Sequence, residues 1–112
     1  MKKTAFFVFR SEGMCFSHVL LYAKELHEKG YDAKIILEGA ATKVIKEQEE
    51  QENPLFLEVK ELGLIDGVCR ACSKAMGVLE YNEKSGIPLL DELKGHPSIE
   101  RYMKEGYDII TL

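Results

Sequence analysis

The sequence predicts an α/β layered domain with a mostly parallel sheet of four to five strands. Short runs of strand-forming residues alternate along the chain with segments of helical periodicity. The first of these runs, residues 6–9, is apolar at every position, which is typical of a strand buried on both faces of a parallel sheet. Of the 112 residues, 46% are apolar and 30% charged, so we expect residues 1–112 to form a single domain around one core.

The chain begins with a predicted strand–helix–strand unit. Residues 6–9 are a continuous apolar run that predicts a buried strand. An amphipathic helix follows, with Gly30 as its expected end, and residues 33–37 predict the second strand. The apolar positions of the helix recur at helical spacing and are Phe16, Val19, Leu20, Ala23 and Leu26.

The middle of the chain predicts helices and a third strand. The Glu- and Gln-rich end of the first of these helices is expected to be a solvated face, and Asn53-Pro54 ends that helix. The third strand is interrupted by Asp66-Gly67. The predicted elements are helices at 41–52 and 55–62, a strand at 64–69 and a helix from Cys72 or Ser73 to Val78.

The last third of the chain has the weakest pattern. Residues 86–90 could form a short strand, which Pro88 confines to a sheet edge or a strand end. Pro97 is expected to begin a last helix that ends at Gly106. Residues 107–112 predict the closing strand.

The charge balance excludes two classes of partner. Lys and Arg total 15 against 19 Asp and Glu, a net charge of −4. Nucleic acid requires a basic surface that this balance does not provide, and an anionic membrane surface would not attract the chain. The apolar run after Lys2 and Lys3 is too short for a signal peptide or a membrane span. We therefore expect a cytoplasmic protein that binds neither nucleic acid nor membranes.

The three cysteines are Cys15, Cys69 and Cys72. An odd number cannot pair fully within one chain, and a reducing compartment keeps thiols free. Cys69 and Cys72 form a C-x-x-C pair where the third strand gives way to a helix, and open α/β sheets bind ligands outside the carboxyl ends of their strands. The helix start, with Arg70 beside it, would favour thiolate. We expect a redox dithiol, a sulfur carrier or half of a metal site; alternatively, both cysteines are small buried apolar residues.

Cys15 follows the first strand, at the same edge of the sheet. It precedes His18 by three residues, so one helix face could present both side chains. If the two strand ends meet, Cys15, His18, Cys69 and Cys72 would form a tetrahedral Cys₃His zinc site. Alternatively, Cys15 packs under the sheet edge and His18 is an ordinary surface or core histidine.

A few further residues are candidates for ligand binding. Glu12 and Gly13 could offer backbone N–H groups to an anion at the start of the first helix, and Cys15 and Arg70 complete the expected substrate-binding set. His96 precedes the last predicted helix, where it either forms local turn structure or lines the site. No dinucleotide fingerprint, Walker A pattern or G-x-S-x-G motif occurs in the sequence.

With these segments in place, the chain resembles the DsrE/DsrF-like family of small cytoplasmic α/β proteins. The resemblance spans most of the chain. It rests on the first strand, the first helix with its glycine turn and second strand, the end of the third strand, and a closing strand preceded by glycine and an aromatic residue. The matching segments are AFFVF (5–9), LLYAKELHEKGYDAK (20–34), GVCRAC (67–72) and GYDIITL (106–112).

The resemblance implies a three-layer α/β/α fold of flavodoxin-like type, homo-oligomers that are often trimers or hexamers, and persulfide sulfur on one cysteine after a central strand. By position, Cys69 matches that cysteine best and Cys72 is second. The leading hypothesis is therefore a sulfurtransferase or sulfur carrier that needs no cofactor and exchanges sulfur with a donor or acceptor protein. The alternatives are the Cys₃His zinc module and an oligomeric small-molecule-binding protein. Five tyrosines suggest either a subunit contact, where tyrosine is enriched, or partial burial at the rim of the domain itself.

Overall fold

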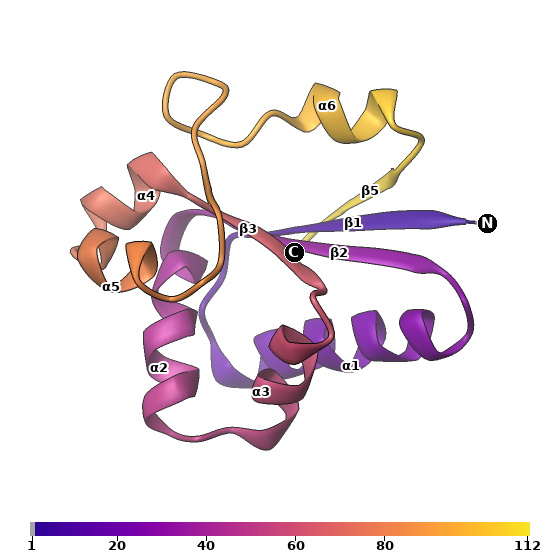
Figure 1. Ribbon diagram of the computed structural model, residues 1–112, viewed down its shortest axis with the longest axis horizontal. Helices are drawn as coiled ribbons and strands as arrows, with labels where there is room; N and C mark the ends of the chain where they lie inside the picture. Colours follow the sequence, from indigo (N-terminus) through magenta and orange to yellow (C-terminus); the bar gives the residue numbers. More distant parts are fainter. Residues whose placement is uncertain (1) are drawn as a thin grey trace.

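A single parallel sheet organises the computed structural model, which describes residues 2–112 (Figure 1). The strand order is β4-β3-β2-β1-β5, and all four neighbouring pairs are parallel. The predicted α/β fold with a parallel sheet is therefore confirmed. The strands are β1 (Lys3–Val8), β2 (Asp32–Leu37), β3 (Ile65–Cys69), β4 (Leu89–Leu90) and β5 (Asp108–Thr111).

Helices cover both faces of this sheet and the end of β3 (Figure 1). Strands β2, β3 and β4 are added one after another on one side of β1, whereas β5 is added on its other side. The order in which strands are added therefore reverses between β1 and β5. Ligands of open α/β sheets bind outside the carboxyl ends of the strands near such a reversal. The helices are α1 (Gly13–Glu28), the 3₁₀ helix η1 (Gly39–Lys43), α2 (Val44–Glu50), α3 (Pro54–Glu61), α4 (Arg70–Ala75), α5 (Leu79–Glu83) and α6 (Ile99–Lys104).

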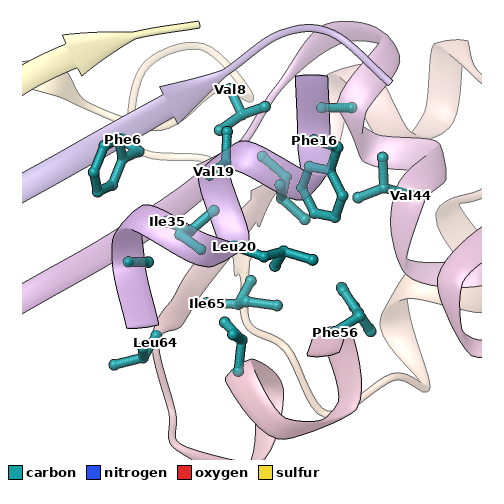
Figure 2. Packing of buried hydrophobic residues seen from close by; sticks show 14 of the residues in the cluster. Phe6, Val8, Phe16, Val19, Leu20, Ile35, Val44, Phe56, Leu64 and Ile65 are labelled. Atoms are coloured by element: carbon teal, nitrogen blue, oxygen red, sulfur yellow. The ribbon is translucent and has the colours of Figure 1, made fainter. Parts of the chain in front are cut away.

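The larger core lies between the sheet and helices α1, α2 and α3 (Figure 2). Phe16 and Leu20 of α1 pack there against Phe56 of α3, and the rings of Phe16 and Phe56 lie 6.2 Å apart. Four of the five apolar positions predicted for the helix are buried, and Leu26 is partly buried against the same cluster. The helical periodicity of the sequence thus identified the face that packs on the sheet.

The opposite face of the sheet is covered by α6, and aromatic rings form its core. Tyr102 packs edge-on against Phe7 at 5.4 Å and against Tyr107 at 5.8 Å. The hydroxyl of Tyr102 donates to Asp66, and the hydroxyl of Tyr107 donates to Asp32 at 2.7 Å. These bonds satisfy the polar ends of the rings, which is why the two tyrosines can be buried in this core.

The tyrosines therefore divide between core and surface. Tyr102 and Tyr107 are buried and Tyr81 is partly buried, whereas Tyr22 and Tyr31 are exposed. Only the last two remain available for the subunit contact that the number of tyrosines suggested.

Strand β3 runs continuously through Asp66-Gly67, and the predicted interruption corresponds to an irregularity in its pairing with β2. The register with β2 shifts between Ile35 and Ile36, which accommodates an extra residue in β3. A Cβ on Gly67 would lie 2.3 Å from Cδ1 of Leu90 in β4. Glycine at this position therefore makes room for β4 to pack, and β4 forms the edge of the sheet, as Pro88 indicated.

The predicted helix over 41–52 is divided into η1 and α2, and its Glu-rich end is only partly a solvated face. Gln48 is buried, and Glu49 accepts hydrogen bonds from Lys60 of α3 and from Tyr81 of α5. Helix α5 was not predicted, because five residues are too few to show a helical period.

Candidate functional site

Cys69 is the last residue of β3 and the N-cap of α4. Its Sγ accepts a hydrogen bond from the backbone N–H of Cys72 at 3.3 Å, which satisfies one free donor of the helix start. Helix α4 therefore begins at Arg70, earlier than the predicted start at Cys72 or Ser73. The Cys69 side chain is fully buried, whereas Cys72 in the first turn is partly exposed.

A chain of buried hydrogen bonds holds the end of β3 in place. The hydroxyl of Ser73 donates to the backbone carbonyl of Cys69 at 2.7 Å. The side-chain amide of Asn82 in α5 donates in turn to Ser73 Oγ at 2.9 Å and to the carbonyl of Thr42 at 3.0 Å. Ser73, Asn82 and Thr42 are all fully buried, so these bonds fix α4 against η1 and α5.

His96 reaches the cysteines from a separate segment, a two-residue turn. The backbone N–H of Leu93 donates to the carbonyl of His96 at 2.7 Å, and the N–H of His96 donates back to Leu93 at 2.9 Å. The central residues Lys94 and Gly95 both have positive φ, at 50° and 91°, as a tight hairpin turn requires. The carbonyl of Gly95 accepts from the N–H of Ala71 at 2.8 Å, which docks the turn on the start of α4.

These three side chains converge on one point. Nδ1 of His96 lies 3.1 Å from Sγ of Cys69 and 3.7 Å from Sγ of Cys72. The prediction that Cys69 and Cys72 lie together at the strand-to-helix junction is confirmed. Both roles considered for His96 are observed, since its backbone closes the turn and its side chain lines the site.

The predicted effect of the helix start on Cys69 is wrong. Burial raises the pKa of the Cys69 thiol to about 12, and the neighbouring Cys72 and Glu38 raise it further, while the N–H of Cys72 lowers it only in part. Arg70 and Lys74 are exposed and are not among the groups that shift this pKa. Desolvation of the thiolate therefore outweighs the hydrogen bond at the helix start.

A cavity of 330 Å³ adjoins His96 at the carboxyl edge of the sheet. Its walls are mainly apolar and include Phe9 after β1 and Thr111 of β5. Glu38, which follows β2, is its acidic residue; burial raises the pKa of Glu38, and the charge of His96 lowers it in part. The cavity extends from the cysteine–histidine cluster toward the place where the strand order reverses.

Cys15 and His18 lie elsewhere, so the predicted Cys₃His set is not assembled. Within residues 2–112, the metal-competent cluster comprises Cys69, Cys72 and His96. Cys15 is exposed and lines a different cavity with His18 and residues of β5 and the C-terminus. The sheet order explains this separation, because β1 and β2 lie between β5 and β3.

The predicted substrate-binding set is also dispersed. Glu12 lies beside Cys15, with its Oε2 3.9 Å from Sγ, and the adjacent Gly13 is exposed. Arg70 is exposed and lines a separate cavity with Lys74. Of this set, none joins the metal-competent cluster.

Sequence reasoning missed Glu38 and the buried pair Ser73 and Asn82. A polar residue at the end of a strand is a usable signal for Glu38, but nothing in the sequence pairs Ser73 with Asn82. The turn at Lys94-Gly95 was detectable, since a residue tolerant of positive φ next to glycine between longer segments indicates a hairpin.

Over the described part of the chain, no helix has the length and apolar content needed to cross a membrane.

Comparisons with known proteins place the chain among relatives. No profile of a known protein family matches it. In the solved structure of a conserved protein of unknown function from Bacteroides thetaiotaomicron, BT1422, the fold is similar, with a TM-score of 0.72 over 98% of this chain and 95% of that one, at 23% identity. An uncharacterized protein of Archaeoglobus fulgidus is 54% identical over 41 residues, which are 37% of this chain and 67% of that protein.

A longer match defines the family. Uncharacterized protein MJ0733 of Methanocaldococcus jannaschii is 39% identical over 95 residues, which cover 85% of this chain and 78% of the relative. Identity at this level over most of both chains indicates common ancestry and a shared fold. The chain therefore belongs to the same family as protein MJ0733 of M. jannaschii.

Proposed function

We propose that this protein is a thiol-based sulfur carrier of the DsrE/DsrF-like kind, which holds sulfane sulfur as a persulfide on Cys72. The observation that supports this proposal is the position of two thiols against one imidazole nitrogen at the end of a central strand. Cys72 is favoured over Cys69 as the attacking thiol because Cys72 is partly exposed, whereas Cys69 is buried with a raised pKa. This choice reverses the order that the family resemblance implied.

The proposed transfer step conserves atoms and electrons. His96 Nδ1 accepts the proton of the Cys72 thiol, and the thiolate attacks the outer sulfur of a donor persulfide, R–S–SH. The donor's sulfur–sulfur bond breaks, Cys72–S–SH forms, and the leaving thiolate takes the proton back from the imidazolium. An acceptor thiolate then attacks the same outer sulfur and restores Cys72, with no net oxidation of the carrier.

The proposal includes partners and a compartment. Donor and acceptor are thiol-bearing molecules or proteins, and free thiols suit a reducing compartment such as the cytoplasm. We also expect a homo-oligomer, because α1 presents Met14, Leu21 and Tyr22 to solvent and the edge strand β5 exposes Ile110. Exposed apolar side chains of this kind are common at subunit contacts.

Intact-mass measurement after incubation with polysulfide tests the proposal. We expect wild-type protein to gain sulfur and Cys72→Ser to gain none at the site. Cys15→Ser should gain sulfur at the site as the wild type does, and should lack only the sulfur that the exposed Cys15 carries in the wild type. His96→Gln should load about 10²- to 10⁴-fold more slowly, the usual contribution of a positioned base.

Circular dichroism of each variant shows whether the fold is retained. Sulfur that persists on Cys72→Ser but is lost from Cys69→Ser would move the role to Cys69. Sulfur found on Cys15 alone, or no sulfur in the wild type, would refute the carrier function.

A further inference from the structure

We propose that Cys69, Cys72 and His96 bind a zinc ion through two sulfurs and one ring nitrogen, with the fourth coordination position open to an external ligand. This inference goes beyond the proposed sulfur carriage and does not depend on it, although both use the same side chains. It also replaces the Cys₃His set expected from the sequence, because His96 supplies the nitrogen in place of His18 and Cys15 takes no part.

The spacing of the three atoms fits a tetrahedral ion. Zinc–sulfur bonds of about 2.3 Å and zinc–nitrogen bonds of about 2.0–2.1 Å place a sulfur and a nitrogen ligand about 3.6 Å apart. Nδ1 of His96 lies 3.1 Å from Sγ of Cys69 and 3.7 Å from Sγ of Cys72, and all three atoms lie within 4.8 Å of one another. The two nitrogen–sulfur distances thus need to change by about half an ångström or less to fit the ion.

The backbone already holds these atoms in place. Cys69 and Cys72 belong to the cap and first turn of one helix, so their separation is fixed by α4. His96 is held by the paired hydrogen bonds with Leu93 and by the docking of Gly95 on Ala71. The N–H of Cys72 points at Sγ of Cys69, and such a bond stabilises the thiolate that a metal ligand must become.

The donor set selects the class of ion. Two thiolates and an imidazole are soft to borderline ligands, which favour zinc over magnesium or calcium. Three protein ligands with a free position are the arrangement of zinc sites that bind an exchangeable water or substrate. His96 also lines the cavity that contains Glu38, so a ligand on the ion could extend into that space.

Direct titration tests the inference. The full-length reduced protein, treated with a chelator and dialysed, is titrated with Zn²⁺ alone by equilibrium dialysis. A parallel titration with Co²⁺ follows the charge-transfer absorption of cobalt–thiolate bonds. We expect one ion per chain and an absorption that falls to about half in Cys72→Ser. In His96→Gln the affinity should fall by about 100-fold or more, beyond the 10- to 100-fold effect of losing an outer-shell partner.

The chain supplies matched controls. Cys15→Ser and His18→Gln remove the same chemical groups in the separate cavity beside β5 and should leave zinc affinity unchanged. Binding that depends on Cys15 or His18, or that survives loss of both Cys72 and His96, would overturn the inference.

A second measurement on wild-type protein avoids the effect of any substitution on folding. Saturating zinc should slow alkylation of Cys72 while leaving alkylation of the exposed Cys15 in the same molecules unchanged. An alkylation rate of Cys72 that is the same with and without zinc would contradict the site.

The two functions fail separately in these experiments. Zinc binding is measured without any sulfur donor, and sulfur loading is measured in the presence of a chelator. Sulfur loading without zinc binding would refute only the proposed metal site. Zinc binding without sulfur loading would refute only the proposed sulfur-carrier function. If both occur, bound zinc should suppress sulfur loading, because the ion occupies the sulfur electron pairs that attack the donor.

Discussion

At the scale of single residues, Gly67 shows how one missing side chain positions an entire strand. Its α-carbon faces the isobutyl group of Leu90, which would lie 2.3 Å from an added Cβ. Because β4 continues into the turn that carries His96, the space at Gly67 also determines where the histidine side chain lies.

We predict that Gly67→Ala lowers the free energy of unfolding by about 1–3 kcal/mol, the usual cost of overpacking. Leu90→Ala alone should also destabilise, because it removes partly buried apolar surface. The double variant should lose less than the sum of the two, since truncating Leu90 relieves the clash. Urea unfolding of the four proteins measures this coupling, and strictly additive losses would show that Leu90 is not what Gly67 avoids.

The sequence offered burial of the two cysteines only as an alternative, and it holds for Cys69 but not for Cys72. The C-x-x-C motif and its place after a strand were readable, because both are local. The desolvation that raises the Cys69 pKa depends on the turn around Gly95, 26 residues away. No local pattern carries that contact.

At the scale of elements, the turn from Leu93 to His96 connects the two halves of the site. Gly95 has φ of 91°, and a Cβ there would meet Cβ of Ala71 at 3.1 Å. Gly86 has nearly the same φ, 87°, but a Cβ added to it would meet nothing within 4 Å. Alanine at Gly86 therefore measures the cost of positive φ alone, whereas alanine at Gly95 adds the contact with Ala71.

Gly86→Ala should cost about 1–2 kcal/mol, which is the penalty for a side chain at positive φ. We expect Gly95→Ala to cost more, and also to speed alkylation of Cys72 as the turn moves away from α4. Urea unfolding and timed thiol labelling measure the two effects. Equal stabilities with unchanged labelling would mean that the turn absorbs the extra methyl group without moving.

Element prediction succeeded where periodicity was long and failed where it was short. The sixteen residues of α1 show enough turns to reveal their buried face, and the apolar runs of β1 and β2 indicated strands buried on both faces. The five residues of α5 show no period to detect, and the strand predicted over 86–90 is reduced to the two residues of β4. Of the site, the sequence identified the two cysteines and raised His96 as an alternative, but it placed Cys15 and His18 there because strand order cannot be read from local patterns.

At the scale of the whole molecule, one carboxylate joins three helices. Glu49 of α2 accepts hydrogen bonds from Lys60 of α3 and, at 2.6 Å, from Tyr81 of α5. Burial raises the pKa of Glu49, but these two hydrogen bonds and the charge of Lys60 outweigh burial and lower the pKa below its usual 4.5. The same contact raises the pKa of Tyr81 to about 12.

A lowered carboxyl pKa makes folding depend on pH. The folded state favours ionised Glu49, so its contribution is fully present above a pH of about 4.5 and is lost as the pH falls through the lower folded pKa. We predict that Glu49→Gln costs about 1 kcal/mol at neutral pH and flattens the decline in stability under acid. Glu47→Gln, on the exposed side of the same helix, is the control. Parallel acid profiles for wild type and Glu49→Gln would show that the carboxylate contributes nothing.

The position of His96 on a docked turn affects the fraction of molecules in which the imidazole lies beside both sulfurs. Releasing Gly95 from Ala71 would carry the imidazole away from both sulfurs while the five strands remained paired. Native proteins open locally at free energies well below that of complete unfolding. The fraction of molecules in which His96 faces both thiols therefore depends on this one turn, and a measurement of global stability alone would overestimate that fraction.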